Sequence, residues 1–280
     1  MKKRQRLFYR TICLILCGAL LSCSSTPYEQ NVAKDYKANL QTVSGNPFIH
    51  KVYVNPAAFT DQTDERKQRF LHVYVGGDGR PYVNGKFTLN PTPLNPLLLG
   101  LMEQDSQPAI YLGRPCYFNP EDSQCDPTWW TLRRYSEKVV NSMISALSNY
   151  SKHYDHIVLV GYSGGGALAM LMAEKIPKVR ILVTVAGNLD IFEWTTYHQY
   201  TPLMESINPA EQPPLRNNII QLHYAGEDDD NIKADWIKTV SEKQKRAEFH
   251  LIEEADHTCC WSELWPGVLE KVKSYESFVD

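Results

Sequence analysis

The sequence predicts an α/β domain built on a doubly wound, mostly parallel sheet with helices on both faces. From about residue 46 onward, short apolar runs rich in β-branched residues alternate with longer stretches of helical period. The runs are apolar almost throughout, which is typical of parallel strands covered on both faces. No segment of the 280 residues resembles an interdomain linker, so we expect a single domain over 46–280.

The expected elements follow in a regular order. The strands are HKVYVNP, FLHVYVGG, AIYLGRPCYF, HIVLVGY, VRILVTVAGN, NIIQLHYAG and AEFHLIEEA. The helices are the amphipathic stretch 132–150, GGALAMLMAEKI, IKADWIKTVSEKQKR and a last segment up to Phe278. The connections 90–97 and 188–217 are irregular and rich in proline. Because long loops in compact domains commonly bind ligands or cover sites, we expect a lid over about 188–217.

Composition limits the class of partner. The chain is 43% hydrophobic and 22% charged, as in ordinary globular proteins. Its formal charge of −3 leaves no basic face for nucleic acid, so we expect no nucleic-acid partner. The sequence leaves the oligomeric state open.

The first 22 residues have the pattern of an export signal. A basic segment, MKKRQRLFYR, precedes TICLILCGALL, an apolar run of about a dozen residues that is too short to span a bilayer. The following LLSCSS resembles the lipobox of bacterial lipoproteins, which implies that Cys23 is lipidated and that 1–22 is removed. Ser24 then implies an outer-membrane location facing the periplasm. The polar, turn-rich composition that follows predicts a tether without a fold of its own over 23–45. A plain signal peptide with an incidental cysteine is the alternative.

Export places the remaining cysteines in an oxidising compartment. Cys116 and Cys125 would close a short loop, and we expect a disulfide there rather than a metal site, because no histidine has ligand spacing with either cysteine. Adjacent Cys259 and Cys260 are expected either to form a vicinal disulfide or to be buried thiols. No metal is expected elsewhere.

The stretch GYSGG, 161–165, matches the G-x-S-x-G motif of serine nucleophiles. It follows an apolar strand and opens a helix, which is the context that this motif requires. The glycines allow strand and helix to approach closely around a strained serine. The helix N-terminus behind the serine favours developing negative charge. We therefore expect Ser163 to be a nucleophile rather than a serine in an ordinary glycine-rich bend.

A serine nucleophile needs a base, and the base needs a carboxylate that orients it. His257 follows the last expected strand and is the expected base. After the preceding strand, Asp228, Asp229 and Asp230 compete for the role of acid, and the spacing from Gly226 favours Asp229. Asp190 is an outside candidate for the acid, its alternative role being a helix cap.

These residues together resemble the α/β-hydrolase family over most of the chain, from about residue 50 to the end. More narrowly, VYVGGDGRPY, RPC, GYSGGGALA, TVAGNLD and INPAE look like a group of proteobacterial lipoproteins of that fold whose substrate is unknown. The resemblance implies an oxyanion hole made by the N–H of Gly164 and a second N–H from the loop GGDGRPY. Gly76 replaces the family's histidine in that loop, and we favour Asp78 over Gly77 as the second donor.

The predicted function is that of a membrane-anchored serine hydrolase that cleaves a carboxylic ester, thioester or amide through an acyl-enzyme, without a cofactor. A small-molecule or acyl ester is preferred to a peptide as substrate. The disulfide loop and the lid are expected to supply the walls of the substrate site, although packing in the core is the alternative role for the aromatic residues. The expected wall residues are Arg114, Tyr117, Trp129, Trp130, Tyr162, Trp194, Tyr197 and His198. A serine peptidase and a non-catalytic envelope lipoprotein that uses the fold as a binding module are the alternatives.

Overall fold

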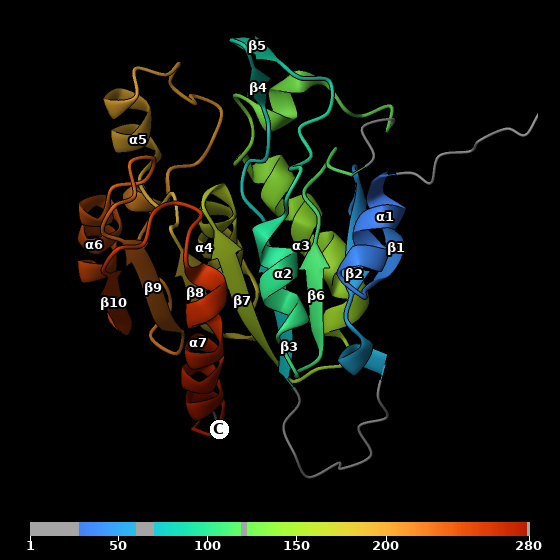
Figure 1. Ribbon diagram of the computed structural model, residues 1–280, viewed down its shortest axis with the longest axis vertical. Coiled ribbons are helices and arrows are strands. Elements are labelled where there is room, and N and C mark those ends of the chain that lie inside the picture. The colour runs from blue at the N-terminus through green and yellow to red at the C-terminus, as the bar shows by residue number, and fades with distance from the viewer. Residues whose placement is uncertain (1–27, 60–69, 119–121, 279–280) are drawn as a thin grey trace, which may run out of the picture.

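The computed structural model describes residues 28–59, 70–118 and 122–278, and its main body is an eight-stranded sheet with helices on both faces (Figure 1). The strands are β1 (Asn39–Ser44), β2 (Ile49–Val54), β3 (Phe70–Val75), β6 (Ala109–Leu112), β7 (His156–Tyr162), β8 (Val179–Val185), β9 (Ile220–Gly226) and β10 (Ala247–Ile252). A separate hairpin is formed by β4 (Tyr82–Val83) and β5 (Lys86–Phe87). The helices are α1 (Tyr28–Asp35), α2 (Leu97–Glu103), α3 (Glu137–Ser151), α4 (Gly164–Lys175), α5 (Ile191–Tyr197), α6 (Ala234–Glu242) and α7 (Trp261–Glu276), with 3-10 turns η1 (Pro56–Phe59), η2 (Pro127–Trp130) and η3 (Pro209–Glu211).

The strand order is β1-β2-β6-β3-β7-β8-β9-β10. The β1–β2 and β2–β6 pairs are antiparallel, and all neighbours from β6 to β10 are parallel. The doubly wound, mostly parallel α/β class predicted from the sequence is therefore confirmed. In such a sheet the carboxyl ends of the parallel strands meet at one edge, which is where ligands bind.

Two apolar cores lie on the two faces of the sheet. Strand side chains alternate between them: Val73 and Leu159 join the cluster that includes residues of α3, α4 and α6, and Tyr74 and Val160 join the cluster that includes residues of α1, α2 and α7. Because helices cover both faces, every residue of β3 is buried. Among the described helices, none has the length and apolar character needed to cross a bilayer.

The structured region begins earlier than the sequence predicts. Both α1 and β1 lie within 23–45, so the prediction of an unstructured tether over that whole range is wrong. The strand β1 is an edge strand with no fully buried residue, which is why its polar sequence, NLQTVS, gives no strand signal. The expected signal 1–22 and the expected lipidation site Cys23 lie outside the described residues.

Two further differences come from capping and from short elements. The helix expected over 132–150 begins at Glu137, because the Ser136 side chain accepts a hydrogen bond from the N–H of Val139 and caps the helix there. The short helix α2 and the β4–β5 hairpin are also present, although prolines and glycines interrupt the sequence pattern over 82–103.

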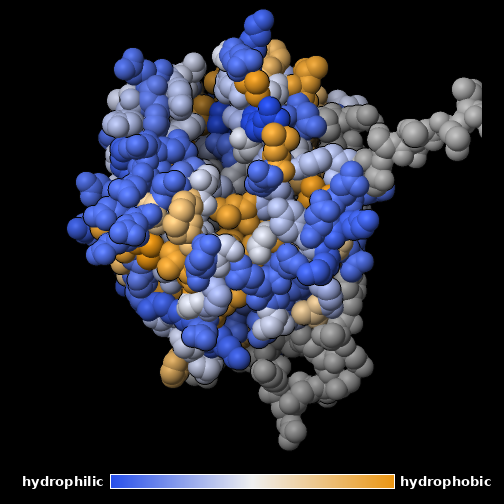
Figure 2. Space-filling model, viewed as in Figure 1, coloured by the Kyte–Doolittle hydropathy of each residue, from blue (hydrophilic) through white to orange (hydrophobic). Residues whose placement is uncertain are grey.

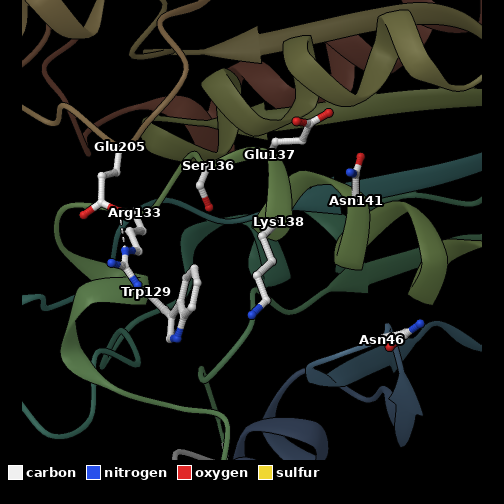
Figure 3. A pocket seen from close by; sticks show the side chains of 8 residues that line it. All are labelled: Asn46, Trp129, Arg133, Ser136, Glu137, Lys138, Asn141 and Glu205. Carbon is white, nitrogen blue, oxygen red and sulfur yellow. Dashed lines mark hydrogen bonds and ion pairs between the residues drawn. The ribbon is translucent and has the colours of Figure 1, made fainter.

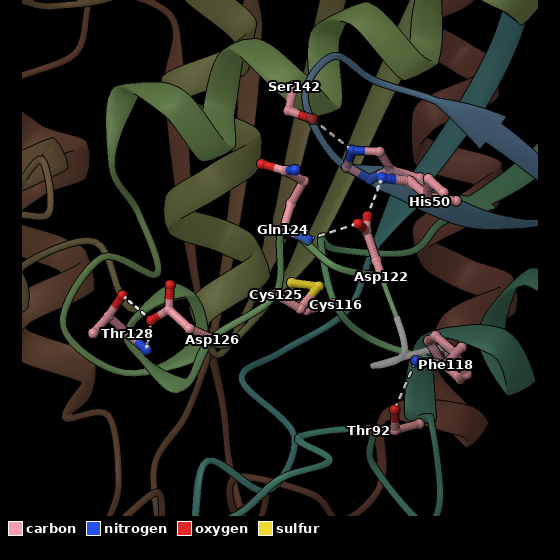
Figure 4. Close-up of a disulfide and its surroundings, with 11 residues drawn as sticks. His50, Thr92, Cys116, Phe118, Asp122, Gln124, Cys125, Asp126, Thr128 and Ser142 are labelled. Atoms are coloured by element: carbon pink, nitrogen blue, oxygen red, sulfur yellow. Dashed lines mark hydrogen bonds between the residues drawn. A yellow bond between two sulfur atoms is a disulfide. The ribbon is translucent and has the colours of Figure 1, made fainter.

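A disulfide joins Cys116 to Cys125, with an S–S distance of 2.04 Å (Figure 4). The ends of this loop are held by further hydrogen bonds: Asp122 accepts from the N–H of Ile49 at 2.9 Å, and Thr92 accepts from the N–H of Phe118 at 2.7 Å. The adjacent pair Cys259 and Cys260 is also joined, which decides between the two states that the sequence allows.

A buried charged cluster lies at the amino end of the sheet. The ring of His72 in β3 is 2.6 Å from Asp105, just after α2, and 2.5 Å from Glu276, the last residue of α7. Because both ring nitrogens face carboxylates, both must donate, so the imidazole is protonated. Burial opposes this charge, but Asp105 and Glu276 outweigh it and raise the pKa of His72 to about 9. The charge thus ties α2 and α7 to the central sheet.

We predict that this cluster makes folding stability depend on alkaline pH. A histidine whose pKa is raised on folding contributes stability that is fully present below its unfolded pKa and is lost as pH rises through the folded value. Between pH 6.5 and 9.5 the free energy of unfolding should fall by about 3 kcal/mol, as measured by denaturant titration. In His72→Asn this decline should be absent, and an equally steep decline in that variant would contradict the assignment.

Candidate active site

Ser163 occupies a strained turn between β7 and α4. Its φ is 53° and its ψ is −125°, a conformation that is costly for a residue other than glycine. Its N–H donates to Val185 at 3.0 Å, and its carbonyl accepts from the N–H groups of Gly166 and Asn188 at 2.8 and 2.9 Å. A Cβ on Gly165 would lie 2.0 Å from the carbonyl oxygen of Val75, so only glycine permits this close approach of helix and strand. The neighbouring elements therefore hold Ser163 at the sheet edge.

Three residues predicted from the sequence lie in one line. Nε2 of His257 is 3.0 Å from Oγ of Ser163, and its Nδ1 is 2.8 Å from Oδ2 of Asp229. The other carboxylate oxygen of Asp229 accepts from the N–H groups of Asn231 and Ile232, both at 2.8 Å. The Asp229 side chain is fully buried, whereas that of His257 is 19% exposed. The carboxylate of Asp229 is therefore fixed, and the imidazole of His257 faces Ser163.

The other candidate acids lie elsewhere. Asp228 and Asp230 are exposed, and Asp230 pairs with Lys233 at 2.6 Å. Asp190 accepts a hydrogen bond from the N–H of Glu193 and caps α5. Of these four aspartates, Asp229 is the one whose carboxylate contacts His257.

Asn231, which no sequence motif indicates, also contacts His257. Its Nδ2 lies 3.0 Å from Nε2 of His257, and its Oδ1 lies 3.2 Å from the indole nitrogen of Trp194 in α5. An indole N–H only donates, so the amide oxygen must face Trp194 and the amide NH₂ must face His257. Nε2 of His257 is therefore an acceptor, and the ring proton lies on Nδ1 toward Asp229. No spacing rule could have found Asn231, because its partners lie on distant segments.

The backbone next to Ser163 has free donors. Among the described residues, no hydrogen-bond partner is present for the N–H groups of Gly77, Asp78 and Gly164. A Cβ added to Gly77 would lie 3.2 Å from Cβ of Ser163, and one added to Gly164 would lie 2.1 Å from Oδ1 of Asp78. The glycine-rich loop after β3 is thus in contact with the start of α4.

This loop is held by a buried charge cluster around the side chain of Asp78. The carboxylate accepts from Arg114 at 2.5 Å, from Arg134 at 2.6 Å and from the hydroxyl of Tyr135 at 2.7 Å. Burial raises the pKa of Asp78, but Arg134 and Arg114 outweigh this and hold it below its ordinary value. Its carbonyl also accepts from the hydroxyl of Tyr117 at 2.7 Å. Two guanidinium groups share one carboxylate, so the cluster is positive overall.

A cavity of about 720 Å³ opens above Ser163. Its walls come from the loop after β3, the β4–β5 hairpin, the segment after α5 and the loops carrying Asn231 and His257. The predicted wall residues Tyr162 and Trp194 do line it, and Tyr162 also donates to the carbonyl of His257 at 3.0 Å.

Two other predicted wall residues do not line this cavity. Arg114 is buried behind Asp78, because its charge is paired there rather than presented to a substrate. Trp130 is buried in the core, with its indole N–H donating to the carbonyl of Thr88 at 3.0 Å. Arg134 lines the cavity instead, and its guanidinium lies 5.8 Å from the ring centre of Trp194.

A second hollow of about 660 Å³ lies at the start of α3 (Figure 3). Trp129, expected near the substrate site, lines this hollow, with Arg133 5.1 Å and Lys138 4.8 Å from its ring centre. None of Ser163, Asp229 and His257 contributes to it. Neither space is lined by the other predicted wall residues, Tyr117, Tyr197 and His198. Nε2 of His198 lies 2.8 Å from the carbonyl oxygen of Asn231.

Comparisons with known proteins agree with this architecture. A model of the dienelactone hydrolase family matches residues 107–262, more than half of the chain. No curated protein matches the sequence.

The mouse alpha/beta hydrolase domain-containing protein 10 is 12% identical with a TM-score of 0.62, over 87% of this chain and 100% of that one. A putative lipase from Acinetobacter baumannii is 11% identical with a TM-score of 0.61, over 92% and 98%. Est1E from Butyrivibrio proteoclasticus, in a structure with ferulic acid bound, is 12% identical with a TM-score of 0.60, over 84% and 98%. These similarities show the α/β-hydrolase fold.

We predict that the charge of Asp78 is essential to folding. Asp78→Asn leaves two buried guanidinium groups without a counter-charge, and removal of one partner from a buried ion pair typically costs about 3–5 kcal/mol. The free energy of unfolding should fall by about that amount in denaturant titrations. The matched control is Asp230→Asn, whose carboxylate is 97% exposed and should matter little. Equal effects of the two substitutions would refute the role assigned to the cluster.

Proposed function

This chain belongs to the dienelactone hydrolase family, and we propose that it is a serine hydrolase that cleaves carboxylic esters through an acyl-enzyme on Ser163. The observation that carries the proposal is the continuous line of hydrogen bonds from Asp229 through His257 to Ser163, at 2.8 and 3.0 Å. A nucleophile, a base and a carboxylate that orients the base are the parts that this chemistry requires.

The first half-reaction begins at the serine hydroxyl. Nε2 of His257, unprotonated and directed at Oγ, takes the proton as Oγ attacks the ester carbonyl. The positive charge that forms on the imidazole is stabilised by the buried carboxylate of Asp229. The imidazolium then gives its proton to the leaving alcohol, and the acyl group stays on Oγ.

The tetrahedral intermediate carries a negative oxygen that needs donors. We assign this role to the N–H groups of Gly164 and of Asp78, with Gly77 as the alternative to Asp78. Their lack of partners, their place beside Ser163 and the N-terminal end of α4 support the assignment. The positive cluster of Arg114, Asp78 and Arg134 stabilises negative charge at the same place.

Hydrolysis of the acyl-enzyme completes the cycle. A water molecule that enters the cavity gives a proton to Nε2 of His257 and attacks the acyl carbonyl. The same donors hold the second oxyanion, and Ser163 recovers its proton when the acid product leaves. No step needs a cofactor, and thioesters or activated amides fit the same sequence of events.

We further propose that the protein is anchored through lipid on Cys23 in the outer membrane, facing the periplasm. The lipobox-like LLSCSS and Ser24 support this placement. Mass spectrometry of the N-terminal peptide from membrane-extracted protein should find a chain that begins at an acylated Cys23. An unmodified cysteine, or a chain that begins elsewhere, would contradict the anchor.

We predict that Ser163→Ala abolishes labelling by a fluorophosphonate probe and lowers kcat for p-nitrophenyl butyrate by about 10⁴-fold or more, because the variant has no nucleophile. His257→Ala should lower both by orders of magnitude, since a serine without its base is barely nucleophilic. The matched control, Ser148→Ala, removes an exposed hydroxyl on α3 and should leave both unchanged.

The outcome can contradict the proposal in two ways. Absence of labelling in folded wild-type protein would favour a non-catalytic binding role. Hydrolysis of aminoacyl nitroanilides in the absence of any ester hydrolysis would favour a peptidase.

A further inference from the structure

Large apolar side chains are exposed around the mouth of the active-site cavity. Of the fourteen that are exposed in the described part of the chain, nine lie in two segments, 82–94 and 192–204. The same segments line the cavity, through Tyr82 and Gly85 on one side and Tyr200 and Leu203 on the other. Apolar side chains gathered in this way on a surface mark a site of interaction.

The first segment belongs to a projecting arm, residues 79–94, which includes the β4–β5 hairpin. Figure 2 shows apolar and strongly hydrophilic side chains side by side at its tip. Phe87 is 57% exposed, Leu89 78% and Leu94 61%. No acidic residue occurs over 79–102, where Arg80 and Lys86 are the charged residues, and both are exposed. Apolar side chains combined with basic ones are typical of segments that bind anionic lipid surfaces.

The second segment is part of the connection 188–217. It consists of α5 and the residues that follow it to Met204, and we refer to this shorter segment as the lid from here on. It exposes Phe192 by 61%, Tyr200 by 51% and Met204 by 86%, and its one acidic residue is Glu193. Figure 1 shows α5 and the β4–β5 hairpin at the same end of the molecule, with the C-terminal end of α7 at the opposite end. The exposed apolar side chains of the arm and the lid therefore lie on the same face of the molecule, on two sides of the cavity.

The N-terminal end of the described chain is fixed beside the arm. The hydroxyl of Tyr28 lies 2.7 Å from the carbonyl of Pro93 and 2.9 Å from that of Leu94. Cys23 is five residues upstream, and a fully extended chain of that length spans at most about 18 Å. A lipid on Cys23 therefore holds the base of the arm close to the bilayer surface.

We infer that the arm and the lid dock onto the lipid surface to which the chain is anchored, so that the cavity opens toward the membrane and receives acyl esters from it. This inference rests on the proposed function and on the proposed anchor at Cys23. Phe87 and Leu89 insert among the acyl chains, while Arg80 and Lys86 contact anionic headgroups. The substrate class is thereby an amphiphilic ester with its acyl chain in the bilayer.

A pair of spin labels tests the docking without any measure of activity. Phe87→Cys and Phe278→Cys are each labelled with a nitroxide in the full lipidated protein on vesicles of phosphatidylethanolamine and phosphatidylglycerol. Phe278 is the matched control because it is 79% exposed at the opposite end of the molecule. The label at 87 should relax with lipid-soluble oxygen and be shielded from an aqueous nickel chelate, and the label at 278 should behave in the opposite way. Equal access of both labels to nickel would overturn the proposal, as would a label at 87 shielded from both reagents, which indicates a protein partner.

Turnover then tests the substrate class. The double variant Phe87→Ser/Leu89→Ser should hydrolyse a fluorogenic long-chain ester embedded in the vesicles about tenfold more slowly, because less apolar surface enters the bilayer. Its rate on soluble p-nitrophenyl butyrate should be unchanged, and Phe278→Ser should change neither rate. An unchanged rate on the embedded ester would overturn the proposed delivery of substrate from the membrane. Wild-type protein that hydrolyses neither ester would instead contradict the proposed function, and the spin labels would still decide the docking.

Discussion

The left-handed backbone of Ser163 is the constraint on which the site depends. With φ at 53°, Ser163 turns the chain sharply from β7 into α4 and places its side chain above the sheet edge. Its carbonyl accepts hydrogen bonds from the N–H groups of Gly166 and Asn188. A conformation of this kind persists only where the surroundings fix it. Here the glycines that follow let the helix contact the backbone of β3, so the loop carrying Asp78 meets the start of α4. Ser163 and the free backbone N–H groups nearest to it are thus positioned by the same contact.

The loop that meets the start of α4 also carries the main buried charges of the site. The loop after β3 lies under the cavity and is held by a carboxylate between two buried arginines rather than by apolar packing. Such a cluster is a costly way to gain stability, since each charge loses its hydration. The cluster instead fixes direction, because charge-assisted hydrogen bonds to both oxygens of the Asp78 carboxylate hold the loop in one orientation. The free N–H groups of this loop are thereby held in one orientation beside Ser163.

Much of this arrangement could be predicted from the sequence, and the parts that could not share a physical reason. Ser163, Asp229 and His257 each follow a strand, so local patterns locate them and the parallel sheet brings them to one edge. Arg134 and Asn231 act through side chains that reach across loops, and no local spacing encodes such contacts. The prediction of Trp130 and Arg114 as cavity walls is wrong, because an aromatic or a cationic residue near a site has the same local pattern whether it faces the core or the cavity. The edge strand β1 was missed because a half-exposed strand has no continuous apolar run.

Asn231 links the wall of the cavity to the proposed base, since its one side chain contacts both the indole of Trp194 in α5 and Nε2 of His257. Connecting segments vary more in sequence than the elements that they join. In this protein the indole of Trp194 determines which way the amide of Asn231 points. A substitution at Trp194 therefore changes more than the wall of the cavity, because it also removes the partner that orients the amide beside His257.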